Sequence, residues 1–60
     1  MKFYITSGKT IIEYHTTKDA MKAFYDTREI DPLCTLWAKD DNDIYTYNPT
    51  HGTFYIVRRD

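Results

Sequence analysis

The spacing of apolar residues changes along the chain, and this change limits the folds that it can form. Between residues 16 and 31, apolar side chains recur every three or four positions, which is typical of an amphipathic helix. On both sides of this segment the side chains alternate with a period of two, which is typical of strands. The pattern predicts an α+β fold of order ββαβββ: a small antiparallel five-stranded sheet with one helix packed on one face. Residues 1–60 would then form a single domain.

The sequence marks both ends of the predicted helix. Thr16 is a suitable N-cap with Asp19 three residues later, and Asp31 precedes Pro32, which disfavours a continued helix. The expected apolar face of the helix consists of Ala20, Met21, Ala23, Phe24 and Tyr25. This face should cover one side of the sheet.

The first two strands, residues 2–6 and 10–15, flank Gly8, which permits a tight hairpin turn. The two central residues of the turn are either Ser7-Gly8 or Gly8-Lys9. Both choices place the same four side chains on one face: Phe3, Ile5, Ile12 and Tyr14.

The faces of the last three strands, residues 33–39, 44–48 and 53–59, depend on the lengths of two loops. We prefer a five-residue last loop, 48–52, closed by a left-handed Gly52. It separates Phe54 and Ile56, facing the helix with Ile44 and Thr46, from Tyr45, Tyr47 and Tyr55. A four-residue loop would mix these sets.

The acidic turn after residues 33–39 decides the position of Trp37. An odd-length turn such as 40–42 places Trp37 beside Tyr45 and Tyr55, on the face opposite the helix. An even-length turn reverses this arrangement and buries Trp37. Both lengths remain open.

The candidate partner-binding residues are an aromatic stripe with one neighbouring arginine: Trp37, Tyr45, Tyr47, Tyr55 and Arg58. One helix of about three turns cannot cover both faces of a five-stranded sheet, so part of the stripe should meet solvent or a partner. Three explanations are open: cross-strand stabilisation of the sheet, a protein-binding patch, or base stacking. For base stacking, phosphate contacts would come from Arg58, Arg59, Lys39 and Lys2.

No motif in the sequence indicates catalysis or metal binding. His15 and His51 lie in separate segments, and Cys34, the single cysteine, lies in an apolar run that favours a buried side chain. The segment "SGKT" at residues 7–10 lacks the first glycine of a phosphate-binding loop. We therefore expect no enzyme activity, no metal and no cofactor.

The formal net charge is −1, from eight basic and nine acidic residues, which argues against a dedicated duplex-DNA binder. The chain has no apolar run long enough to span a membrane, and one cysteine fits a reducing compartment, so we expect a cytoplasmic location and no membrane partner.

These observations favour a small non-enzymatic protein-binding module, which acts as an inhibitor or adaptor of an unidentified protein partner. In size alone, the chain is similar to the compact stand-alone proteins that phages and mobile elements encode. The alternative is a single-stranded nucleic-acid-binding protein that uses the aromatic sheet face. A third expectation is a homodimer formed through the first or the last strand, if that strand is a free edge.

Overall fold

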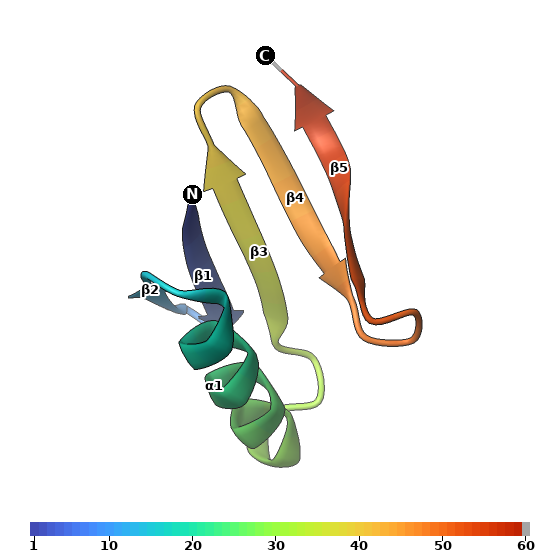
Figure 1. Ribbon diagram of the computed structural model, residues 1–60. Helices are drawn as coiled ribbons and strands as arrows, with labels where there is room; N and C mark the ends of the chain where they lie inside the picture. The colour runs from blue at the N-terminus through green and yellow to red at the C-terminus, as the bar shows by residue number, and fades with distance from the viewer. Residues whose placement is uncertain (60) are drawn as a thin grey trace.

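The computed structural model describes the backbone of residues 1–59 and the side chains of residues 1–57. Its elements, in chain order, are β1 (Lys2–Ser7), β2 (Thr10–Tyr14), α1 (Thr17–Ile30), β3 (Thr35–Asp40), β4 (Asp43–Asn48) and β5 (Thr53–Arg59). The strands form one antiparallel sheet in the order β2-β1-β3-β4-β5 (Figure 1). This arrangement confirms the predicted fold class.

Helix α1 begins and ends where the sequence predicts. The side chain of Thr16 accepts a hydrogen bond from the backbone N–H of Asp19 at 3.2 Å, and Asp31 is the C-cap before Pro32. The helix packs on β1, β2 and β3, while the β4–β5 hairpin forms the part of the sheet toward the opposite edge (Figure 1). One helix therefore covers only part of one face.

The β1–β2 hairpin has the turn Gly8-Lys9, one of the two predicted turns, with Gly8 at a φ of 60°. Glycine adopts this left-handed conformation without a steric cost. The register pairs Phe3 with Tyr14 and Ile5 with Ile12, so the four predicted side chains share a face.

The sequence left the length of the turn between β3 and β4 open, and the structure has the even-length turn. Asp40 pairs with Asp43, so the turn contains only two residues, Asp41 and Asn42. Asp41 has a φ of 48°, a left-handed conformation that aspartate tolerates better than most residues. The short turn therefore closes without a glycine.

The preferred five-residue loop between β4 and β5 is also wrong, although Gly52 is left-handed with a φ of 68°. Asn48 pairs with Thr53, which leaves a four-residue loop. The carbonyl of Asn48 accepts the N–H of Gly52 at 2.8 Å, and its side chain accepts the N–H of Thr50 at 2.9 Å. These bonds explain why Asn48 is the last residue of β4 rather than the first of the loop.

The core lies between α1 and the sheet. Its buried residues are Phe3, Ile5, Ala20, Phe24, Cys34, Leu36, Ala38 and Tyr47. Ala38 is paired with Phe3 on one side and with Tyr45 on the other, and it is fully buried. Its small side chain leaves room above β3 for Phe54, whose ring centroid lies 5.9 Å from that of Phe3. The contact between Phe3 and Phe54 thus attaches the β4–β5 hairpin to the core under α1.

Asp31 connects the end of α1 to the β1–β2 hairpin. Its carboxylate accepts the hydroxyl of Ser7 at 2.6 Å and the backbone N–H of Leu33 at 3.1 Å. We expect Asp31→Ala to lower the free energy of unfolding by about 1–2 kcal/mol, because both donors lose a charged acceptor. Urea unfolding measures the change. Asp26→Ala, at an exposed helix position, is the control and should stay within about 0.5 kcal/mol of the wild type; equal losses would contradict the role of Asp31.

Candidate functional site

The strand register places one row of side chains across the face of the sheet opposite α1, which we call the open face. Tyr4 of β1 pairs with Trp37 of β3, Trp37 pairs with Thr46 of β4, and Thr46 pairs with Tyr55 of β5. Trp37 and Tyr55 therefore share the open face, although the turn between β3 and β4 has the even length that was expected to bury Trp37. Tyr55 is 48% exposed, whereas Trp37 is half-buried.

Tyr4 and Trp37 form a stacked aromatic pair on the open face. Their ring centroids are 4.4 Å apart, and the ring planes differ by 21°. The indole N–H of Trp37 donates a hydrogen bond to the hydroxyl of Thr6 at 2.9 Å, which fixes the orientation of the indole. Two central strands thus hold a preformed aromatic surface.

Tyr45 and Tyr47 do not belong to the open face, and the predicted tyrosine stripe is wrong in this respect. The four-residue loop pairs Tyr47 with Phe54 and Tyr45 with Ile56, so all four side chains point toward the side of α1. Tyr47 is only 6% exposed and meets the ring of Phe24 edge-on, with the centroids 5.6 Å apart. It is a core residue, and its side chain is not accessible to a partner.

The buried Tyr47 gives the protein a testable response to alkaline pH. The hydroxyls of Tyr47 and Tyr25 are 2.8 Å apart, and this hydrogen bond, followed by burial, raises the pKa of Tyr47 above its ordinary value of about 10. The folded state therefore holds the phenol proton more tightly than the unfolded state. This contribution to stability is complete below about pH 10 and is lost as the pH rises through the raised pKa.

We expect phenolate absorbance to show a late ionisation of Tyr47, which Tyr47→Phe abolishes. Tyr25→Phe removes the hydrogen-bond partner of Tyr47 and should move that ionisation to lower pH. A late ionisation that persists in Tyr47→Phe would contradict this assignment.

Arg58, the remaining predicted site residue, has a side chain outside the described residues, and so has Arg59. The backbone register pairs Arg58 with Ile44. Ile44 is two residues from Thr46 and so lies next to the row of Tyr4, Trp37, Thr46 and Tyr55, which we call the aromatic row. Lys2 and Lys39 were expected only as phosphate contacts in the base-stacking explanation. They lie directly opposite each other on β1 and β3.

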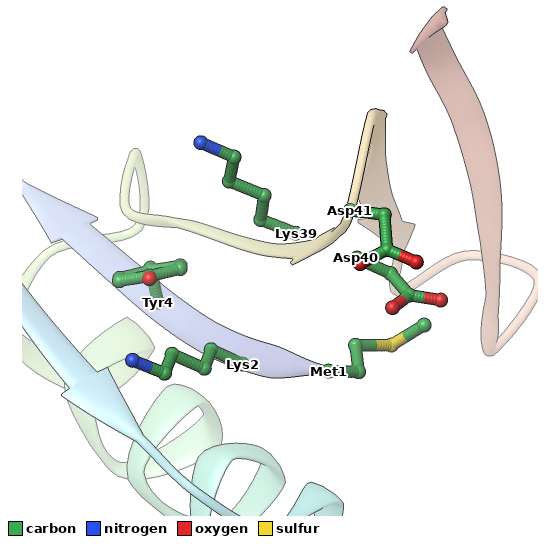
Figure 2. Close-up of a pocket in the computed structure, with 6 residues that line it drawn as sticks. All are labelled: Met1, Lys2, Tyr4, Lys39, Asp40 and Asp41. Carbon is green, nitrogen blue, oxygen red and sulfur yellow. The ribbon is translucent and has the colours of Figure 1, made fainter.

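A solvent-open hollow of about 340 Å³ lies at this end of the sheet (Figure 2). It is lined by Met1, Lys2, Tyr4, Lys39, Asp40 and Asp41. Lys2 and Lys39 extend toward the side of Tyr4, whereas the carboxylates of Asp40 and Asp41 lie near Met1 (Figure 2). The hollow therefore continues the aromatic surface into a charged region.

The sequence prediction did not include Tyr4 in the site. The alternation of residues 2–6 places Tyr4 on the face away from Phe3 and Ile5, so its face was predictable. Its neighbour was not, because nothing in the sequence shows that β1 lies beside β3. The stacking of Tyr4 on Trp37 therefore depends on the strand order, which places β1 beside β3.

The two edges of the sheet are β2 and β5, whereas β1 is internal. Of the two strands expected as a free edge, β5 alone is one. It exposes three consecutive apolar side chains, Tyr55, Ile56 and Val57. A change of register between Ile44 and Tyr45 leaves Val57 without a partner position on β4.

No group of three or more His, Cys, Asp or Glu side chains within the described residues could hold a metal ion. Burial, and next the charge of Asp31, raises the pKa of the Cys34 thiol, which keeps it in the protonated, less nucleophilic form. In the same part of the chain, no helix has the length and apolarity needed to cross a membrane.

Comparisons with protein-family models, with curated proteins and with solved structures found no match to this chain. The functional proposal therefore depends on the geometry of the described residues.

Proposed function

We propose that this chain is a small, non-enzymatic protein-binding module that binds its partner through the open face of the sheet. The observation that carries the proposal is the stacked Tyr4–Trp37 pair, with Tyr55 in the same row, on the face that α1 does not cover. These three aromatic side chains lie on the strands of a single sheet, so their spacing is set by the backbone register.

Aromatic side chains at such positions are effective in protein recognition. Tyrosine and tryptophan bring a large contact area with few rotatable bonds, and they are enriched among the residues that contribute most to interface affinity. The hydrogen bond from Trp37 to Thr6 orders the indole before a partner binds. Less conformational entropy is then lost on association.

The module is proposed to act as an inhibitor or adaptor: it occupies a surface of its partner and performs no chemistry itself. The row of Tyr4, Trp37, Thr46 and Tyr55 spans four of the five strands, and this extent supports the proposed role. We further propose a cytoplasmic location, which the single buried cysteine supports.

A second candidate function is the binding of single-stranded nucleic acid. The observation that favours it is the position of Lys2 and Lys39 next to the aromatic pair, since proteins of this class combine stacking rings with cationic side chains. The acidic residues Asp40 and Asp41 in the same hollow oppose it.

Self-association through β5 is a further proposal, because this edge strand exposes consecutive apolar side chains and has unpaired backbone groups along its outer side. Sedimentation over a concentration series tests it. A mass that rises with concentration is expected, and a constant monomer mass would contradict the proposal.

Affinity capture from a lysate of the native host, with and without nuclease, separates the two candidate functions. The immobilised wild-type chain should retain a protein after nuclease treatment, and a Tyr55→Ala chain should retain less of it. Tyr55 is suited to this comparison because its side chain lies outside the buried core. Loss of all retained material after nuclease treatment would instead favour nucleic acid, and equal retention by both chains would contradict the assignment to the open face.

A further inference from the structure

Lys2 and Lys39 are an unfavourable pair of neighbours. They occupy directly opposed positions on β1 and β3, where two like charges destabilise a sheet. Within the described side chains, neither ammonium group forms an ion pair with a carboxylate. The carboxylate of Glu13, on the same face, lies instead 3.6 Å from Nε2 of His15.

The two lysines also lie next to the aromatic surface. Lys2 is two residues from Tyr4 on β1, and Lys39 is two residues from Trp37 on β3, so each lies about 7 Å along its strand from a ring-bearing residue. Both lysines line the open hollow together with Tyr4 (Figure 2). A partner that covers the Tyr4–Trp37 pair would therefore come within reach of both ammonium groups.

We propose that the Lys2–Lys39 pair is a carboxylate-binding site, which receives an acidic side chain of the protein that binds the open face. This inference rests on the proposed function and specifies the chemistry of the partner: an acidic residue close to the residues that contact the stacked rings. A bound carboxylate would turn the repulsion between the two lysines into two attractive interactions. Positions that lower stability without a compensating contact are expected at functional sites.

The surroundings of the pair favour one carboxylate over a strand of phosphates. Asp40 and Asp41 line the other part of the hollow, so negative charge lies beside the lysine pair. A single carboxylate needs no more than the lysine pair. Single-stranded nucleic acid presents a phosphate at every nucleotide and is usually bound along a continuous cationic groove.

A trade-off between stability and binding should follow. Lys39→Glu replaces the repulsion with an attraction to Lys2, so the Tm should rise by about 1–8 °C in the absence of any ligand. Lys22→Glu, at an exposed position of α1, is the matched control and should not produce this rise. A Tm that falls in Lys39→Glu would show that the pair is not a source of repulsion and would overturn the proposal.

The site itself can be tested with small probes at low ionic strength. We expect a tetraglutamate peptide with blocked ends to shift the backbone NMR signals of Lys2 and Lys39 in a saturable way, whereas a tetraglutamine peptide does not. Lys39→Gln and Lys2→Gln should each weaken this binding about two- to fivefold, and Lys22→Gln should leave it unchanged. These probes carry no aromatic group and require no partner, so a failure here leaves the role of Trp37 and Tyr55 in partner capture untouched.

Three results would overturn the carboxylate site: equal shifts with tetraglutamine, equal weakening by Lys22→Gln and Lys39→Gln, or tighter binding of a short oligothymidylate than of tetraglutamate at the pair. The last result would assign the lysines to nucleic acid. Conversely, tetraglutamate binding could depend on both lysines while partner capture is the same for the wild type and Tyr55→Ala. This combination would support the carboxylate site and contradict the proposed open-face function.

Discussion

Leu36→Ala is expected to lower the free energy of unfolding by about 2–5 kcal/mol. Leu36 is fully buried at the centre of the sheet, on β3, under α1. Domains have a total stability of roughly 0.05–0.15 kcal/mol per residue, which is about 3–9 kcal/mol for a chain of this length. A single cavity in the core thus removes a large share of the total.

Leu33→Ala is the matched control for this prediction, because the chemical change is the same and the environment is the opposite. Leu33 lies just after α1 and is 89% exposed. The substitution should therefore change the free energy of unfolding by no more than about 0.5 kcal/mol. Urea unfolding followed by far-UV circular dichroism compares the two variants, and similar losses in both would contradict the described core.

Trp37→Ala is expected to weaken binding of the captured partner by about 2 kcal/mol or more, or roughly thirtyfold in Kd. The indole is stacked on Tyr4 and oriented by Thr6, so its removal deletes the centre of the aromatic row. Calorimetry or fluorescence polarisation with the purified partner measures the change.

Two controls separate binding from folding in this experiment. Circular dichroism shows whether Trp37→Ala retains the native fold, and Tyr55→Ala removes a half-exposed ring of the same row with a smaller effect on stability. Leu33→Ala, outside the open face, should leave the Kd unchanged. An unchanged Kd in both aromatic variants would contradict the proposed surface.

The sequence was sufficient to predict the elements whose local signals agree with one another. Thr16 and Asp19 fix the start of α1, and both candidate turns at Gly8 give the same faces for β1 and β2. The position of these elements therefore did not depend on a choice that the sequence leaves open.

The faces of β4 could not be predicted, because the sequence leaves the length of the turn before it open and the preferred loop after it is one residue too long. The turn after β3 is one residue shorter than the odd-length example, which exchanges the faces of β4 relative to Trp37. The loop after β4 is also one residue shorter, which exchanges the faces again at β5. Relative to the odd-length alternative, the two changes cancel for Tyr55 and Phe54, and only β4 is inverted.

The consequences for the site follow from that single inverted strand. Tyr45 and Tyr47 move to the side of α1, where Tyr47 becomes part of the core. Trp37 and Tyr55 stay on the open face, with Thr46 between them. Asp41 and Asn48 lie at the two turns, but aspartate and asparagine accept several backbone geometries, so their presence in the sequence does not select one loop length.

The most direct test of the open-face proposal is the NMR signal of the Trp37 indole N–H during titration with the captured partner. The chain contains one tryptophan, so this signal is unique, and it reports the centre of the aromatic row without any substitution. We predict that the indole signal and the backbone signals of Tyr4 and Tyr55 shift as the partner binds, while those of Lys18 and Lys22 on the outer side of α1 do not. Saturation of binding with an unchanged indole signal, or with shifts confined to α1, would contradict the account.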